Sequence, residues 1–198
     1  MDTIEREVAK EGYRLVAGVD EAGRGPLAGP VVAASVIFPA PAPIGLGIND
    51  SKKLTPQTRE RLVPVINRHA IAVGIGVVWT PTIDAINIRQ AALLAMVRAV
   101  EAMTVQPDIL LIDGNATINT RLPQRAIIKG DGLSVSIAAA SIIAKTTRDA
   151  IMDAYHELHP QYNFKNNKGY GTQEHLKALR LHGPTPIHRV TFHGVLAE

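Results

Sequence analysis

Four acidic residues stand at the ends of apolar runs, and they are the first sign of chemistry in this sequence. Asp20 and Glu21 end the run RLVAGV, Asp113 ends ILLI, and Asp131 closes AIIKG. Each run predicts a buried central strand, and neighbouring parallel strands bring their last residues to one edge of a sheet, where open α/β sheets bind ligands. We therefore expect the four carboxylates to converge at a single sheet edge.

Four converging carboxylates repel one another, so at neutral pH such a cluster requires bound cations or raised pKa values. Hard divalent ions such as Mg²⁺ prefer oxygen ligands of this kind. Two such ions about 3.5–4 Å apart are the apparatus for in-line attack at a phosphodiester. The alternative is that these acids are solvated or cap neighbouring helices, because Asp is favoured in turns. Hydrophobic periodicity alone leaves both interpretations open.

A glycine-rich segment follows the first two acids. Residues Gly23–Ala28 match the pattern G-x-G-x-x-A of dinucleotide-binding loops. That loop must open a helix, whereas Pro30 here leads into a β-branched run, so the context argues against a nucleotide cofactor. Without a Cβ, Gly23 and Gly25 let the backbone approach a ligand, and Arg24 can reach a phosphate. Such backbone groups could sense a 2′-hydroxyl, although a tight turn would also need glycine.

The rest of the chain predicts the elements that must position these residues. Apolar, β-branched runs predict strands over 14–20, 31–38, 72–78, 109–114 and 126–131. Helical spacing and capping residues predict helices over 55–70, 82–103, 134–158 and 172–182. Residues 39–49 and 160–171 are predicted loops. This order indicates an α/β sheet with helices on its faces, in one domain over 1–198 whose residues from about 160 to 198 form a helical extension.

Composition removes several classes of function. The sequence has no cysteine, which excludes disulfides, thiolate zinc sites and cysteine nucleophiles. No apolar run approaches the roughly 18 residues of a membrane span, and the charged N-terminus lacks a secretory signal, so we expect a cytoplasmic protein. A net charge of +3 permits a nucleic-acid partner without requiring one. The spacing of His156 and His159 does not match the zinc motif H-E-x-x-H.

Five motifs in this order resemble bacterial ribonuclease HII. They are GVDEAGRGPLAGP at 18–30, DSKKL at 50–54, IDG at 112–114, KGD at 129–131 with SIAAASIIAKTTRD at 136–149, and KGYGT at 168–172. The resemblance extends over about residues 14–192. It implies a ribonuclease H-like fold, which is a mixed sheet flanked by helices with a C-terminal helical extension.

The resemblance also implies roles for single residues. The metal-binding acids of the family would be Asp20, Glu21, Asp113 and Asp131, which would hold two Mg²⁺ or Mn²⁺ ions during catalysis. Its Gly-Arg-Gly element would be Gly23, Arg24 and Gly25, in contact with the 2′-hydroxyl, and Tyr170 would stack on the following deoxyribose. The implied reaction cleaves the phosphodiester 5′ to a ribonucleotide, in RNA–DNA hybrids and at single ribonucleotides in duplex DNA. It leaves a 3′-hydroxyl and a 5′-phosphate.

Further polar residues are expected to bind the substrate, largely through phosphates and without reading its sequence. They are Ser51, Lys52, Lys53, Lys145 and Arg148. The alternative for the charged ones is a solvated helix face, in which Lys145 and Asp149 form an i,i+4 pair. Two rival classes also stay open, a non-catalytic nucleic-acid-binding module and a nuclease that needs a run of ribonucleotides. We expect a monomer whose partners are RNA–DNA hybrids and DNA duplexes containing ribonucleotides.

Overall fold

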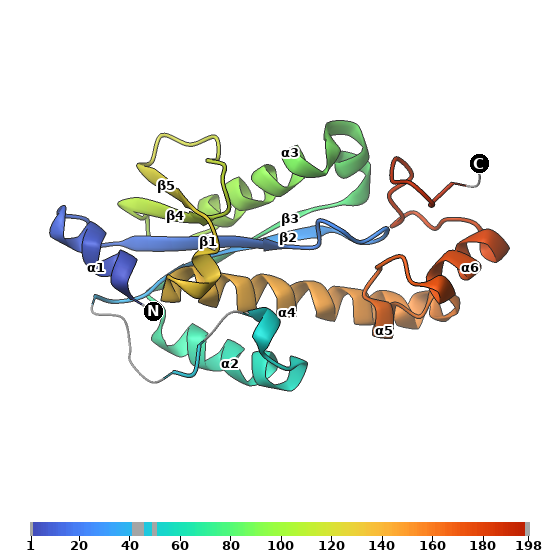
Figure 1. Ribbon diagram of the computed structural model, residues 1–198, viewed down its shortest axis with the longest axis horizontal. Helices are drawn as coiled ribbons and strands as arrows, with labels where there is room; N and C mark the ends of the chain where they lie inside the picture. The colour runs from blue at the N-terminus through green and yellow to red at the C-terminus, as the bar shows by residue number, and fades with distance from the viewer. Residues whose placement is uncertain (1, 41–45, 49–50, 197–198) are drawn as a thin grey trace.

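The chain folds around a mixed five-stranded sheet, seen in a computed structural model that describes residues 2–40, 46–48 and 51–196 (Figure 1). The strands are β1 (Val16–Ala22), β2 (Val31–Ile37), β3 (Ala72–Val78), β4 (Ile109–Asp113) and β5 (Gln124–Ile127). Their order in the sheet is β3-β2-β1-β4-β5. The first three pair antiparallel, while β4 pairs parallel with β1 and β5 parallel with β4. The predicted mixed sheet is confirmed.

Helices cover both faces of this sheet. One face carries α3 (Thr80–Glu101), and the other carries α4 (Val135–Leu158), against which α2 (Pro56–His69) packs (Figure 1). The central strands β1 and β2 are therefore buried on both faces, and they consist of nearly continuous apolar residues. Close packing depends on Gly18 against α4 and on Gly74 against α3, since a Cβ at either position would meet helix backbone within 2.2 Å.

Helix ends follow the capping residues in the sequence. The side chains of Thr55 and Thr172 accept the N–H groups of Thr58 and His175, as predicted, and Ser134 caps α4 in the same way. The helix predicted over 82–103 runs instead from Thr80 to Glu101. It is interrupted at Asn87, whose φ is 67° and whose side-chain oxygen accepts the N–H groups of the next turn.

Two predictions need correction. Residues 126–131 are not a buried strand, because β5 is a short edge strand that ends at Ile127. Lys129 then adopts a left-handed conformation, and Asp131 lies in a 3-10 turn, η2 (Gly130–Gly132). An N-terminal helix, α1 (Thr3–Lys10), was not predicted, and the predicted loop at 160–171 contains η3 (Pro160–Tyr162) and α5 (Phe164–Asn167). Of the predicted loop at 39–49, residues 41–45 and 49 lie outside the described residues.

The C-terminal segment packs at the far end of α4, away from α1 (Figure 1). It contains α5 and α6 (Gln173–His182), and its core forms around the stacked rings of Tyr162 and Phe164 with Ala28 and Met152. This packing joins the C-terminal segment to the loop that follows β1. Among the described helices, none combines the length and apolarity needed to cross a membrane.

Candidate active site

Three chain segments bring the four acids to one edge of the sheet. Because Val19 pairs with Ile112 in the parallel ladder, Asp20 and Asp113 stand side by side on β1 and β4. Glu21 is the next residue of β1. Asp131 arrives from η2, beyond the end of β5, and the N–H of Gly130 donates to Asp113 Oδ1 at 2.7 Å.

Asp20 is buried and Glu21 is partly buried, and their negative charges repel each other. Asp20 is 5% exposed, and burial raises its pKa well above the ordinary value, with a further rise from the charges of Glu21 and Asp113. Burial also raises the pKa of Glu21, although the nearby guanidinium of Arg24 opposes that shift. Arg24 Nη1 lies 3.5 Å from Glu21 Oε1. Both carboxylates would be stabilised by a cation between them.

The other two acids, Asp113 and Asp131, lie near the ammonium group of Lys52. Burial raises the pKa of Asp113, and the charge of Asp131 adds to the rise, while the Gly130 N–H and the charge of Lys52 oppose it. Lys52 Nζ lies 3.1 Å from Asp131 Oδ2, from the turn η1 (Ser51–Lys53). The position of Lys52 places one residue of the DSKKL motif at the acid cluster. Asp50 of that motif lies outside the described residues.

This donor set fits hard divalent cations, since it offers only carboxylate oxygens and its charges are destabilised by burial and by one another. Among the described residues, no three acidic or histidine side chains are arranged to hold a metal ion as they stand.

Ser141 on α4 supports the most buried acid, and sequence reasoning missed it. Its hydroxyl hydrogen-bonds Asp20, and it lies 2.8 Å from the Ser51 hydroxyl. Either hydroxyl of the Ser51–Ser141 pair can donate to the other, and the Ser141 hydroxyl lowers the pKa of Asp20 against the effect of burial. Ser51 is 4% exposed and contacts Ser141, and its direct contact with substrate stays a prediction. The sequence carried no signal for Ser141 beyond a small residue on a helix.

The glycine loop and Tyr170 lie together beside the acids. A Cβ placed at Gly25 would lie 3.3 Å from Tyr170 Cε1, and the Tyr170 side chain is 48% exposed. A small pocket of about 50 Å³ opens next to them, lined partly by Glu21, Arg24 and Asp113. Arg89, at the start of the resumed helix after Asn87, also lines this pocket, and sequence reasoning missed it.

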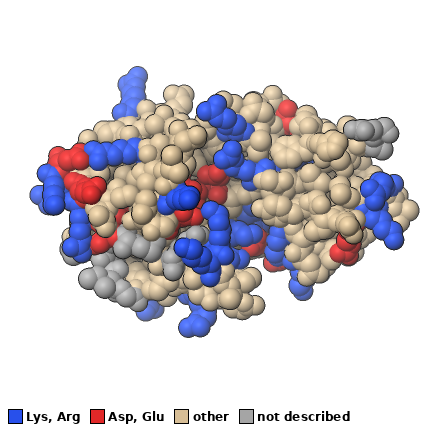
Figure 2. Space-filling model, viewed as in Figure 1, with Lys and Arg blue, Asp and Glu red and all other residues tan. Residues whose placement is uncertain are grey.

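The remaining basic candidates differ in accessibility. Lys53 is exposed, and Lys145 Nζ pairs with Asp149 Oδ1 at 2.6 Å, so the predicted i,i+4 pair is present. Arg148 as a phosphate contact is wrong, because its side chain is only 1% exposed and its guanidinium donates to main-chain carbonyls. Figure 2 shows acidic side chains near the centre of one face, with Lys and Arg around them.

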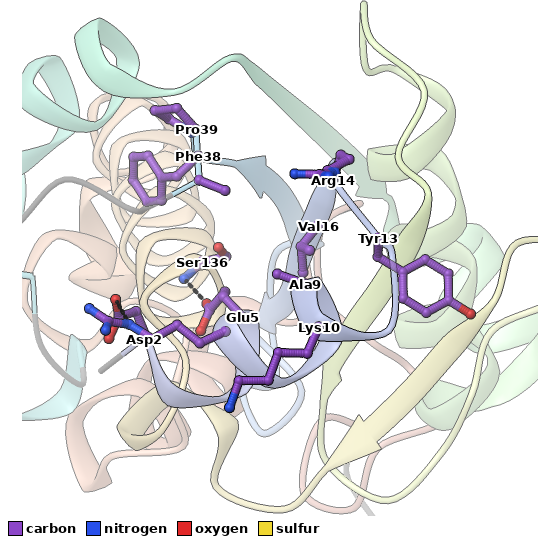
Figure 3. Close-up of a pocket in the computed structure, with 12 residues that line it drawn as sticks. Asp2, Glu5, Ala9, Lys10, Tyr13, Arg14, Val16, Phe38, Pro39 and Ser136 are labelled. Atoms are coloured by element: carbon purple, nitrogen blue, oxygen red, sulfur yellow. Dashed lines mark hydrogen bonds and ion pairs between the residues drawn. The ribbon is translucent and has the colours of Figure 1, made fainter.

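A larger hollow of about 620 Å³ lies elsewhere, between α1 and the end of β2 (Figure 3). Its walls include Tyr13, Val16 and Phe38, and none of the four clustered acids lines it. Glu5 in this hollow accepts hydrogen bonds from the Ser134 hydroxyl and the Ser136 N–H, which anchors α1 to the start of α4. The size of the hollow therefore does not mark it as the reaction site.

A mixed sheet with helices on both faces and an acid cluster at one edge defines a ribonuclease H-like enzyme. The family model described as Ribonuclease HII matches residues 17–195, and the chain belongs to this family of type HII ribonucleases H. Ribonuclease HII from Syntrophus aciditrophicus (strain SB) is 55% identical over 195 residues, which cover 97% of this chain and 90% of that protein.

Solved structures agree with this assignment. Ribonuclease H2 from Pyrococcus horikoshii OT3 has a TM-score of 0.77 and 25% sequence identity, over 91% of this chain and 95% of that one. Bst-RNase HIII in complex with Mn²⁺ has a TM-score of 0.71 at 20% identity, over 92% of this chain and 68% of that one. The latter likeness shows the shared fold.

Proposed function

We propose that this ribonuclease H cleaves the phosphodiester on the 5′ side of a ribonucleotide, in RNA–DNA hybrids and at single ribonucleotides within duplex DNA. The products carry a 3′-hydroxyl and a 5′-phosphate. The observation that carries the proposal is the meeting of four carboxylates, from three chain segments, beside the Gly23–Gly25 loop and Tyr170. The proposed physiological role is removal of ribonucleotides from DNA.

The four acids are proposed to hold two Mg²⁺ or Mn²⁺ ions; the ribonuclease HIII neighbour is described in complex with Mn²⁺. When bound, such ions activate water and neutralise charge at the scissile phosphate. The protein itself orients the carboxylates that would hold the ions. Asp20 Oδ1 accepts the Glu21 N–H at 2.7 Å, and Ser141 also holds this carboxylate. The backbone N–H groups of Gly130 and Asp131 hold the Asp113 carboxylate.

Substrate binding is assigned to the groups around the acids. Lys52, whose Nζ lies 3.1 Å from Asp131 Oδ2, is proposed to contact a phosphate of the substrate, and Lys53 and Lys145 are further proposed phosphate contacts. Backbone groups of Gly23–Gly25 are proposed to contact the 2′-hydroxyl. Tyr170, which lies beside Gly25, stacks on the next deoxyribose.

The proposal also covers the oligomeric state, the domain organisation and the location of the protein. A monomer consisting of one domain binds the duplex through this face, and residues from about 160 to 198 contribute Tyr170 as a packed extension. We also propose a cytoplasmic location, since the named relative is bacterial and bacterial DNA lies in the cytoplasm.

A gel assay with one ribonucleotide in an otherwise DNA duplex tests the proposal. The enzyme should cut 5′ to the ribose with Mg²⁺ or Mn²⁺ and be inactive with a chelator. Asp20→Asn and Asp113→Asn should each abolish turnover while duplex binding persists, whereas Glu101→Gln, at an exposed acid on the end of α3, should cut like wild type.

Three outcomes would contradict the proposal in different ways. Cleavage that requires a run of ribonucleotides would indicate a general hybrid nuclease. Binding without any product would indicate a binding module. Near-normal rates of Asp20→Asn with Mg²⁺ would remove the carboxylates from the mechanism.

A further inference from the structure

Two arginine side chains are buried beneath the Gly23–Gly25 loop. Arg148, from α4, is 1% exposed, and Arg189, from the C-terminal segment, is fully buried. Within the described part of the chain, neither forms an ion pair with a carboxylate. Burial lowers the pKa of Arg148 to about 10 and that of Arg189 to about 9, so both are charged at neutral pH.

Main-chain carbonyls take the place of counter-ions. Arg189 donates from Nη2 to Gly23 O at 2.6 Å, from Nη1 to Arg24 O at 3.0 Å, and from Nε and Nη2 to Gly29 O at 3.1 and 2.9 Å. A planar guanidinium with five donors suits this arrangement. Because a buried charge without such partners is costly, the loop backbone and Arg189 hold each other in one geometry.

The second arginine joins this loop to the Tyr170 turn. Arg148 donates from Nε to Pro30 O at 3.0 Å, from Nη2 to Ala28 O at 3.0 Å and from Nη1 to Lys168 O at 2.9 Å. The Leu27 N–H also donates to Gly169 O at 2.8 Å. These contacts keep Tyr170 beside Gly25.

The contacts of Arg189 determine where the loop N–H groups point. In a planar trans peptide the N–H points opposite to the C=O. Since Arg189 binds the carbonyls of Gly23 and Arg24 from the interior, the N–H groups of Arg24 and Gly25 point outward. Both residues are exposed, and neither N–H donates to another group of the described chain. Two successive outward N–H groups form a concave site for an oxygen ligand.

We infer that Arg189 is a positioning residue for ribose recognition: it orients the Arg24 and Gly25 amides toward the substrate's 2′-oxygen, while Arg148 keeps Tyr170 in register with them. This inference rests on the proposed function and adds the residues that set its selectivity. Neither arginine touches the substrate.

The test compares Arg189→Lys with wild type on two duplexes that differ at one sugar, ribose or 2′-fluoro-deoxyribose. Lysine keeps the charge but cannot bind three carbonyls in one plane. Fluorine is a poor hydrogen-bond acceptor. The ratio of kcat/KM on the ribose duplex to kcat/KM on the 2′-fluoro duplex therefore measures the contribution of the hydrogen bond from the loop amides to the 2′-oxygen. We expect this ratio to fall about two- to tenfold in Arg189→Lys, as for a lost hydrogen bond. Arg98→Lys is the matched control, because Arg98 is exposed and donates to the carbonyl of Val77, away from the loop.

The outcomes separate this inference from the proposed function. If wild type does not cleave the ribose duplex, the proposed function fails. If wild type cleaves and Arg189→Lys lowers both rates equally, the side chain supports only the fold and the inference is overturned. If Arg189→Lys does not fold, amide NMR of the wild type decides, with a chelator present. A ribose-containing duplex should shift the Arg24 and Gly25 amides more than an all-DNA duplex does, and equal shifts would overturn the inference.

Discussion

Replacing Gly18 with alanine should damage both stability and catalysis, for one geometric reason. Gly18 lies on β1 where α4 comes closest to the sheet, and a Cβ there would stand 2.2 Å from the backbone of Ser136 and Ile137. Ordinary contact begins at 3.4 Å, so α4 must move by the difference, about 1.2 Å. Helix backbone cannot rotate out of the way as a side chain could.

The expected loss of stability is about 1–3 kcal/mol, the usual cost of overpacking a core. For a protein of this length, that lowers the Tm by roughly 2–12 °C. The effect on the cleavage rate should be larger than the effect on stability. Because Ser141 lies on α4 and Asp131 just before it, moving the helix displaces Ser141 from Asp20 and Asp131 from Asp113. A misplacement of about 1 Å can lower the rate by about a hundredfold.

Gly74→Ala is the matched control. A Cβ at Gly74 would stand 2.0 Å from Ala99 O of α3, so it should destabilise the fold to a similar degree, yet β3 carries no residue of the acid cluster. Thermal denaturation followed by circular dichroism, and single-turnover cleavage well below either Tm, measure the two effects. Equal rate losses in both variants would refute the claim that moving α4 misplaces the catalytic acids. An unchanged Tm in Gly18→Ala would refute the claim that a Cβ at this position overpacks the core.

Three other predictions concern titration, metal and substrate. Burial lowers the pKa of His188 to about 4, so between about pH 6.5 and 4 the unfolded chain takes up a proton that the folded chain does not. Wild type should therefore lose about 3 kcal/mol more than His188→Gln from pH 7 to 4, and parallel pH profiles in urea denaturation would argue against it. Since burial and the charge of Asp131 raise the pKa of Asp113, Mg²⁺ should raise the Tm of wild type more than that of Asp113→Asn, and equal increases would contradict the metal site. Tyr170→Ala should slow cutting at a single embedded ribonucleotide without lowering the Tm, because its ring is half exposed; unchanged cutting would remove Tyr170 from substrate recognition.

Local patterns predicted much of the fold. Apolar runs located β1 and β4, and therefore the positions of Asp20 and Asp113, because a buried strand needs a continuous apolar sequence. Thr55 and Thr172 marked helix starts, since a side-chain oxygen satisfies N–H groups that the first turn leaves open. The same reasoning failed at 126–131, where Ile128 is 70% exposed and the chain turns before Asp131.

The sequence by itself determined which residue types are present and where the chain prefers strand, helix or turn, because those preferences depend on neighbours a few positions away. Only the tertiary structure decided how Arg148 and Arg189 are used. Their carbonyl partners lie more than 100 residues away in the chain for all but one contact. A side chain's burial and partners depend on which distant surfaces pack against it, and no local pattern records that.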